Sequence, residues 1–356
     1  MITSFQNKRI AGVLTVLPQN EIPFEDEIEN YTFQPKQTLR LKKIMGYKKH
    51  CIAADSTATS DLCVVGLKHI LKHNYLKPED IGALIVLTIT PDHFVPHTSN
   101  IIQARCNLST NILCMDIVQG CAGFLLGLMQ GFLLLEHMAD KKVVLINADV
   151  LSHKISKQDR NSYPLCGDAA TITILENSPS NEKIWCNIYM DGKRGDALKI
   201  PAGGSRLPCG PKTAIKHDAG DGNLRSLNNM CMDGEAVFQF VQRDVPPLIE
   251  ETLVYAGIKK EEIEWYLFHQ PNRFMLRKLA EKLEIPYEKV PMDIVENFGN
   301  PSGASIPLLI TADLSSQMMT KKSLCCLSAF GGGLTWGAMI MHLGGMDFCE
   351  MLHSNL

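Results

Sequence analysis

The feature that most constrains the fold of this 356-residue chain is an internal repeat. The tetrapeptide MDIV occurs at 115–118 and again at 292–295, an offset of 177 residues. Three further pairs of similar segments keep the same order in both halves: LKPEDIGALIVL at 76–87 with IKKEEIEWYLFH at 258–269, KKVVLINADVL from Lys141 with KKSLCCLSAFG from Lys321, and GDAATITIL from Gly167 with WGAMIMHL from Trp336. Because this period is far longer than a solenoid unit, the repeat predicts a duplicated domain.

Within each half, short apolar runs of strand length alternate with helical stretches. GALIVLTIT and KVVLINADV are typical of the strands, and CAGFLLGLMQGFLLLEHM is typical of the helices. The alternation predicts mixed, mostly parallel sheets that are covered by helices. Two such halves with buried helices between their sheets would form an α/β, five-layer αβαβα sandwich. We expect the halves to span 1–178 and 236–356, joined by a connection or insertion at 179–235 that is rich in Gly, Pro, Asn and Asp.

The uncharged run from Ile117 to Leu135 is long enough to be a membrane span. A helix that is apolar on every side is equally expected at the centre of a large soluble core, and the flanking strand-like segments favour that interpretation. Gly123, Gly127 and Gly131 recur at four-residue spacing, which predicts a close approach between two helices.

Composition bounds the function classes. The net charge of −3 provides no overall field that would attract nucleic acid or a membrane surface. The 12 cysteines are scattered without a CxxC pair, which argues against a zinc ribbon or a disulfide framework and favours the reducing cytoplasm. We therefore expect a cytoplasmic protein with no bound metal.

The strongest local signal is the segment DIVQGCAGF at 116–124. A strand is expected to end near Val118, a turn to use Gly120, and a long helix to begin at about Cys121. The partial positive charge of a helix start would lower the pKa of the Cys121 thiol and favour a nucleophilic thiolate. The N–H of the same residue could also bind an oxyanion. The alternative, a buried structural cysteine, stays open on position alone.

Three further segments place polar or flexible residues at predicted strand ends. His269 follows the strand-like run EWYLF, although a core histidine would show the same pattern. Asn300 lies in NFGNPSGAS after the second MDIV, which we expect to be a strand, so this turn would match the position of Cys121; an ordinary Asn-Pro turn is the alternative. The glycines Gly331, Gly332 and Gly333 would permit close approach of the backbone to a ligand.

Taken together, these motifs resemble the β-ketoacyl-acyl carrier protein synthase III family. The segments that carry the resemblance are CAGF at 121–124, GDAA at 167–170, MDGEAVF at 232–238, HQPN at 269–272, GNPSGAS at 299–305 and FGGGLTWG at 330–337. They keep the family's order and span nearly the whole chain. The resemblance implies a thiolase-like fold, a homodimer, no cofactor, and a catalytic triad of Cys121, His269 and Asn300.

The resemblance also implies a mechanism. Cys121 would accept an acyl group from an acyl-CoA or acyl-carrier-protein donor, with the oxyanion held by the N–H groups of Cys121 and Gly332. A malonyl thioester, on acyl carrier protein, would then lose carbon dioxide while His269 and Asn300 donate hydrogen bonds to its enolate oxygen. The product would be a 3-oxoacyl thioester of fatty-acid or specialised lipid or polyketide synthesis. Two alternatives stay open: transfer of the acyl group to an amine, alcohol or β-keto acceptor, and a non-catalytic subunit of a paired synthase.

The chain departs from the family pattern where the donor would bind. Arg40 and Ile44 occupy the positions of a tryptophan and an arginine that hold the adenine of coenzyme A, whereas Arg160 matches a second adenine-side arginine. Cys166 replaces a phenylalanine at the border of the acyl pocket. These departures predict a donor that is longer than acetyl and is not chiefly a coenzyme A ester.

Two more groups of residues are expected to contact the substrates. Asn272 of HQPN, with Phe94 and Val95 of the loop PDHFVP, is expected to bind substrate. The helix after HQPN carries a basic face away from its leucine stripe, which would dock an acidic carrier protein or would simply be a solvated face. The residues of this face are Arg273, Arg277, Lys278 and Lys282.

Overall fold

The computed structural model describes residues 1–138, 140–220 and 222–356, and within these ranges most strands join one of two large sheets. The first sheet has the strand order β17-β2-β8-β7-β5-β6, with bounds Phe348–Ser354, Lys8–Pro18, Ala169–Asn177, Lys142–Asp149, Ile81–Leu87 and Leu113–Ile117. The second sheet has the order β1-β9-β16-β15-β14, with bounds Ile2–Gln6, Lys183–Met190, Thr335–Leu343, Ser323–Gly331 and Trp265–Phe268. Short pairs join β3 (Glu21–Pro23) to β4 (Lys49–Cys51), β10 (Leu198–Lys199) to β13 (Cys231–Met232), and β11 (His217–Asp218) to β12 (Leu224–Arg225).

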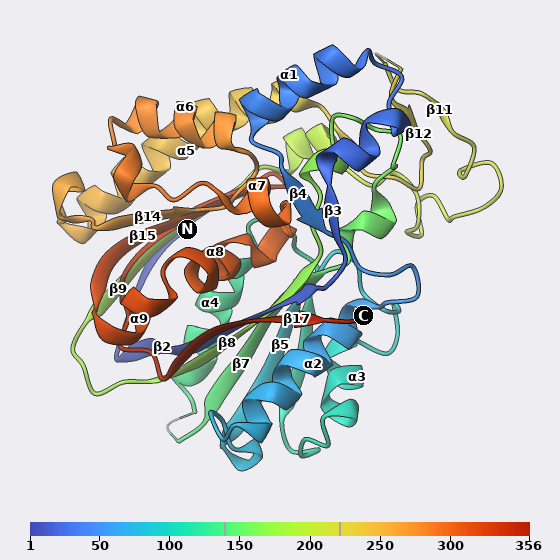
Figure 1. Ribbon diagram of the computed structural model, residues 1–356. Coiled ribbons are helices and arrows are strands. Elements are labelled where there is room, and N and C mark those ends of the chain that lie inside the picture. Colours follow the sequence, from blue (N-terminus) through green and yellow to red (C-terminus); the bar gives the residue numbers. More distant parts are fainter. Residues whose placement is uncertain (139, 221) are drawn as a thin grey trace.

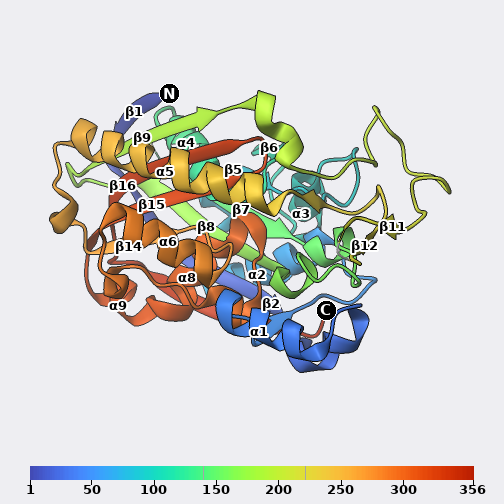
Figure 2. The ribbon, with the colours of Figure 1, turned by 90° about the horizontal axis from the view of Figure 1, so that it is seen from above.

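Helices form three layers around these sheets (Figures 1 and 2). Between the sheets lie α4 (Gly123–Leu135) and α8 (Ser305–Asp313). The outer face of the first sheet is covered by α2 (Thr59–Lys72) and α3 (Thr98–Arg105), and that of the second by α5 (Gly234–Ala256) and α6 (Arg273–Leu283). Three α-helices remain: α1 (Pro35–Met45), α7 (Ile294–Phe298) and α9 (Ser315–Thr320). Of these, α1 lies next to α6. The predicted five-layer α/β sandwich is confirmed.

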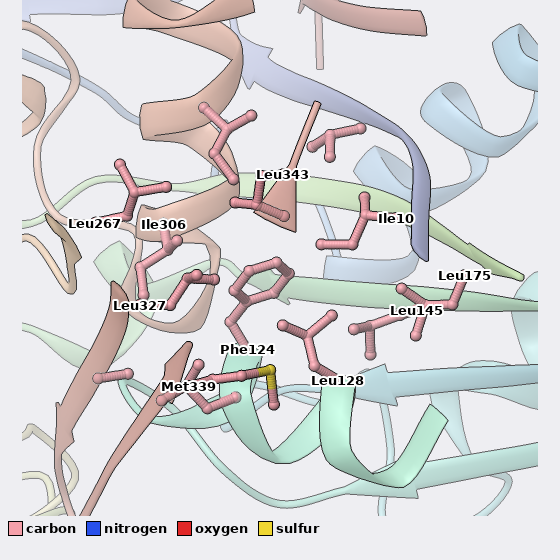
Figure 3. Packing of buried hydrophobic residues seen from close by; sticks show 14 of the residues in the cluster. Ile10, Phe124, Leu128, Leu145, Leu175, Leu267, Ile306, Leu327, Met339 and Leu343 are labelled. Carbon is pink, nitrogen blue, oxygen red and sulfur yellow. The ribbon is translucent and has the colours of Figure 1, made fainter. Parts of the chain in front are cut away.

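The central layer is a continuous apolar core (Figure 3). Phe124 and Leu128 project from α4 among Leu145 of the first sheet and Leu327 and Met339 of the second. A helix that faces a sheet on both sides must be apolar all round, which explains the uncharged run in this segment. In the described residues, no helix is long and apolar enough to cross a membrane.

The glycine stripe of α4 faces the first sheet. A Cβ on Gly127 would lie 2.5 Å from Leu145 Cδ1 and 2.8 Å from Leu87 Cδ1, and one on Gly131 would collide with Leu175. The prediction that these glycines bring two helices together is wrong; they let α4 lie close against β5, β7 and β8.

Several other features differ from the sequence-based expectations. The second MDIV does not form a strand, because Ile294 begins α7; the equivalent of the edge strand β6 is therefore absent from the described part of the second sheet. The segment expected to be a connection from 179 contains β9, which pairs with β1 and β16 inside the second sheet. The terminal strands also cross between halves, since β1 joins the second sheet and β17 the first. The sheets are mixed as predicted, but their pairings are not mostly parallel.

Candidate active site

Cys121 lies in the turn between β6 and α4. The chain turns at Gly120, whose carbonyl accepts a hydrogen bond from the Gly123 N–H at 2.6 Å, and α4 begins at Gly123, two residues later than predicted. Cys121 is half-buried. The thiol therefore lies just before the first turn of the central helix, at the carboxyl end of a parallel strand.

The prediction of a lowered thiol pKa is wrong. Desolvation by burial, followed by the nearby carboxylate of Asp149, raises the pKa of Cys121 to about 11. The Ser302 side chain and the N–H groups of Cys121 and Gly332 oppose this rise without reversing it. The resting nucleophile is thus a neutral thiol.

The glycine loop after β15 packs directly against the thiol. A Cβ on Gly331 would collide with the Cβ and Sγ of Cys121, so only glycine fits there. The Gln119 side chain donates a hydrogen bond to the Gly332 carbonyl at 3.0 Å. This bond helps to fix the glycine loop, and the Gly332 N–H of this loop lies within hydrogen-bonding reach of the Cys121 thiol. Gly332 is the residue that the family resemblance implied as an oxyanion-binding group.

His269 follows β14 and is buried. Its backbone N–H donates to the Ser328 carbonyl at 2.8 Å, and its Nδ1 lies 2.7 Å from Ser305 Oγ at the start of α8. Burial lowers the pKa of His269 to about 3, although the Ser302 backbone opposes the change. The imidazole is therefore neutral at physiological pH, as a hydrogen-bond donor to an enolate oxygen requires.

Asn300 is held by its backbone and by its side chain. Its N–H donates to the Leu165 carbonyl at 2.6 Å, and its carbonyl accepts from the Gly167 N–H at 3.2 Å. Its Oδ1 accepts the Ser302 N–H at 2.9 Å. Since the amide oxygen is occupied in this way, the NH₂ group is the part of the carboxamide that can serve a ligand.

The three side chains lie in the wall of one cavity of about 1660 Å³. The glycines Gly331, Gly332 and Gly333 line the same cavity. Cys166 and Phe94 also line it. Beside Cys166 the wall is apolar, with Leu151, Ile155 and Met230 packed around it.

Other predicted substrate residues lie elsewhere. Asn272 caps α6, with its Oδ1 accepting the Met275 N–H at 2.8 Å, and the cavity is lined by its neighbours Pro271 and Met275 instead. Val95 is 84% exposed and does not line the cavity. The Oδ1 of Asn272 is therefore used by the start of α6.

The adenine-side positions lie as follows. Arg40 is exposed on α1, so it offers no platform at the cavity. The guanidinium of Arg160 stacks on the ring of Phe33, with 3.1 Å between its central carbon and the ring centroid. An aromatic partner for Arg160 does exist, but in this closed pair no space is left for a base between the two groups.

The basic face of α6 is partly neutralised. The Arg273 guanidinium pairs with Asp293 and Glu296, and Lys278 pairs with Glu281 at 2.7 Å. Arg277 lies over the ring of Tyr287, 5.8 Å from its centroid. Arg273 is thus held within its own surface and is a poor candidate for docking a partner.

Sequence reasoning missed three polar groups of the site: Asp149 and Ser302 beside Cys121, and Ser305 beside His269. Ser302 and Ser305 belong to the GNPSGAS motif that was noted only for Asn300, and Asp149 ends the apolar strand β7. A carboxylate at the end of a buried strand was a signal that could have drawn attention to Asp149. No cluster of three or more His, Cys, Asp or Glu side chains suited to a metal occurs among the described residues.

Comparison with known proteins decides the family. Residues 115–192 match the family model of 3-oxoacyl-[acyl-carrier-protein (ACP)] synthase III, and residues 253–343 match the model of its C-terminal part. A β-ketoacyl-[acyl-carrier-protein] synthase III of Clostridium perfringens is 32% identical over 339 residues, which cover 95% of this chain and 100% of that protein. The chain belongs to the 3-oxoacyl-[acyl-carrier-protein] synthase III family.

Two further relatives agree with this assignment. The β-ketoacyl-[acyl-carrier-protein] synthase III of Lactococcus lactis is 34% identical over 288 residues, covering 80% of this chain and 85% of that protein. The crystal structure of a 3-oxoacyl-(acyl-carrier protein) synthase from Burkholderia xenovorans superposes with a TM-score of 0.92, at 32% identity, over 99% of both chains. The synthase III chain is thus a thiolase-fold acyltransferase with acyl-condensing activity.

Proposed function

We propose that this synthase condenses an acyl thioester with malonyl-acyl carrier protein through an acyl-Cys121 intermediate, with loss of carbon dioxide, for fatty-acid or specialised lipid or polyketide synthesis. The observation that carries the proposal is the convergence of Cys121, His269 and Asn300 on one cavity. In the first half-reaction the Cys121 sulfur attacks the donor carbonyl, and the N–H groups of Cys121 and Gly332 bind the oxyanion.

The second half-reaction uses the other two side chains. Ser305 can donate its hydroxyl proton to His269 Nδ1, which leaves the ring proton on Nε2. Nε2–H and the Asn300 NH₂ group then donate to the thioester oxygen of malonyl as it becomes an enolate. Carbon dioxide leaves, and the enolate carbon attacks the acyl-Cys121 carbonyl. The tetrahedral intermediate then expels the Cys121 thiolate, which takes up a proton from solvent to restore the resting thiol.

The proposed donor is longer than acetyl and carrier-bound. The small side chain of Cys166 and its apolar neighbours support a long acyl chain, because each buried methylene contributes roughly 0.8 kcal/mol. The closed stack of Arg160 on Phe33 disfavours a donor that must insert an adenine there. The test compares kcat/KM for acetyl-CoA, octanoyl-CoA and octanoyl-acyl carrier protein; a preference for acetyl-CoA would contradict both parts.

The proposed assembly is a cytoplasmic homodimer. Strand β6 is an edge strand of the first sheet, and three large apolar side chains near it are exposed: Phe94 at 79%, Val95 at 84% and Val118 at 80%. All 12 cysteines are free thiols, which supports a reducing compartment. Sedimentation at micromolar concentration tests the dimer, and a monomeric protein would contradict it.

The reaction is tested by two products of one incubation. Wild-type protein is mixed with octanoyl-acyl carrier protein and [3-¹⁴C]malonyl-acyl carrier protein, labelled in the free carboxyl carbon. We expect octanoyl mass on the Cys121 peptide and release of ¹⁴CO₂. Acyl transfer without ¹⁴CO₂ would favour transfer to another nucleophile, and no acylation would favour a non-catalytic subunit.

A further inference from the structure

A buried carboxyl group lies behind the nucleophile, and neither half-reaction has yet given it a role. Asp149 is 1% exposed at the end of β7. Its Oδ1 accepts three hydrogen bonds, from Thr88 Oγ1 at 2.9 Å, the Ile89 N–H at 2.8 Å and Thr90 Oγ1 at 3.1 Å. The Ser302 side chain also lies close enough to this carboxylate to lower its pKa. Oδ1 is therefore held in place by three donors, and Ser302 approaches the same carboxylate.

Ser302 lies between this carboxyl group and the thiol. Its hydroxyl is buried and makes no ordinary hydrogen bond among the described residues, yet it is close enough to lower the pKa values of both Cys121 and Asp149. Its backbone has φ of 55°, a left-handed conformation that is uncommon for serine. A Cβ on Gly120 would lie 2.8 Å from Ser302 Oγ, so the hydroxyl packs against the turn that carries Cys121.

The chemistry at Cys121 needs a proton acceptor. With a thiol pKa of about 11, the thiolate fraction at pH 7 is about 10⁻⁴. His269 is a weak base, because burial lowers its pKa to about 3. Burial instead raises the pKa of Asp149 to about 6, which makes its carboxylate the stronger base of the two and leaves it ionised at neutral pH.

We propose that Asp149 is the proton acceptor for acylation of Cys121 and that the Ser302 hydroxyl relays the proton. As the sulfur attacks the donor carbonyl, the thiol proton passes to Ser302 Oγ and the Ser302 proton passes to Asp149 Oδ2. When the tetrahedral intermediate collapses, the bond to the donor sulfur breaks. The same proton returns through Ser302 to the departing thiolate, so the acyl-enzyme forms with Asp149 again ionised.

The relay separates the two half-reactions. His269 stays neutral and serves the enolate, while Asp149 serves only the thiol. The other titratable groups that feel Asp149 are Cys63 of α2 and Cys166 before β8, and both are buried thiols whose pKa values are raised further by that carboxylate. Neither competes with Asp149 for the proton at neutral pH.

The test is the pH dependence of single-turnover acylation by octanoyl-acyl carrier protein, measured by mass spectrometry of the Cys121 peptide. In the wild type the rate should rise with pH through an inflection near 6 and then level off, because ionised Asp149 is the active form. Asp149→Asn should lower the rate at pH 7 by about 10²–10⁴ and remove this inflection. Ser302→Gly should also lower the acylation rate and remove the inflection, because it removes the relaying hydroxyl. Glycine is chosen because it accepts the positive φ of residue 302 without strain.

Controls separate this role from a structural one. Asp168→Asn removes another buried carboxylate, which binds the Ala53 N–H and Ser152, and should keep the inflection near 6. Protein acylated before mixing should release carbon dioxide from malonyl-acyl carrier protein within about threefold of wild type in Asp149→Asn and Ser302→Gly. If acylation keeps its wild-type pH profile in both variants, or if both half-reactions fall equally, the relay is refuted. If wild-type Cys121 is not acylated at all, the proposed function fails instead.

Discussion

The two central helices begin at matching places in the duplicated halves, yet they present different chemistry. The turn before α4 follows strand β6 and carries one nucleophile, Cys121. The turn before α8 follows the short helix α7 and carries Asn300, with Ser302 and Ser305 next to it. The two halves share the layers and the buried central helix. They differ at the sheet edge, where β6 of the first half corresponds to the helix α7 of the second, and in the side chains of the turns before α4 and α8. One half thus supplies the sulfur, and the other supplies hydrogen-bonding groups aimed at the same cavity.

The largest expected effect comes from removing the nucleophile of the first half. Cys121→Ala should reduce condensation to background, because no acyl-enzyme can form. Product formation from octanoyl- and malonyl-acyl carrier protein measures this loss, with Cys114→Ala as the control, since this half-buried thiol does not line the cavity. Full turnover in Cys121→Ala, with acyl mass on another cysteine, would show that the nucleophile of the first half is a different residue.

The next effect comes from the second half. His269→Ala should slow decarboxylation by about 10²–10³, the cost of losing one oxyanion donor, while acylation of Cys121 changes far less. Stopped incubations that follow ¹⁴CO₂ and acyl-Cys121 separately measure the two rates. Equal losses in both would mean that His269 is not specific to the second half-reaction.

A smaller effect should distinguish the central helices by their packing. The described helix α8 contains no glycine, whereas α4 lies against the first sheet through its glycine stripe. Gly127→Val should lower the free energy of unfolding by about 1–3 kcal/mol, because Leu145 and Leu87 already fill the space beside it. Urea unfolding measures the change. Gly192→Val is the control, since no atom lies within 4 Å of a Cβ added there, and it should change the free energy of unfolding by about 0.5 kcal/mol or less.

The docking of the carrier protein tests the outer surface of the second half. Charge reversal at Arg277 and Lys282 of α6 should lower kcat/KM for carrier-bound substrate by about 2–10-fold and weaken its dependence on salt. The double reversal of Lys68 and Lys72, exposed on α2 in the opposite outer layer, is the matched control. Identical kinetics for the two double variants would favour a solvated face on α6.

The smallest change is expected in the pH dependence of the second half-reaction. Because burial lowers the pKa of His269 to about 3, its imidazole stays neutral between pH 8 and pH 5. Carbon dioxide release by protein acylated in advance should therefore be nearly constant over that range. The lowered pKa also makes the free energy of unfolding fall as the pH drops from the ordinary pKa of histidine toward 3. Over that range the histidine is protonated in the unfolded chain but not in the folded protein. A steep loss of release near pH 6.5 would contradict a neutral, buried His269.

The layers could be predicted from the sequence because buried strands and helices leave apolar segments of characteristic length, and these segments alternate in the same order in both halves. The meeting of Cys121, His269 and Asn300 could be anticipated because the internal repeat places the turns of Cys121 and Asn300 at matching positions and His269 follows a strand, although the strand predicted before Asn300 is the helix α7. The raised pKa of the Cys121 thiol could not be predicted from the sequence. Burial of the thiol and its closeness to the Asp149 carboxylate exist only after distant segments pack together. The helix at 294–298 likewise could not be predicted, because α7 packs against β4 and α8, and these tertiary contacts override a strand-like motif.

The division of labour between the halves is tested most directly in the Asn300→Ala protein, with both products measured in one sample. Octanoyl- and [3-¹⁴C]malonyl-acyl carrier protein are added together, and the Cys121 peptide and ¹⁴CO₂ are measured at the same time points. The account predicts nearly complete octanoylation of Cys121 with ¹⁴CO₂ release slower by about 10²–10³. Loss of octanoylation in proportion to the loss of ¹⁴CO₂ would contradict it.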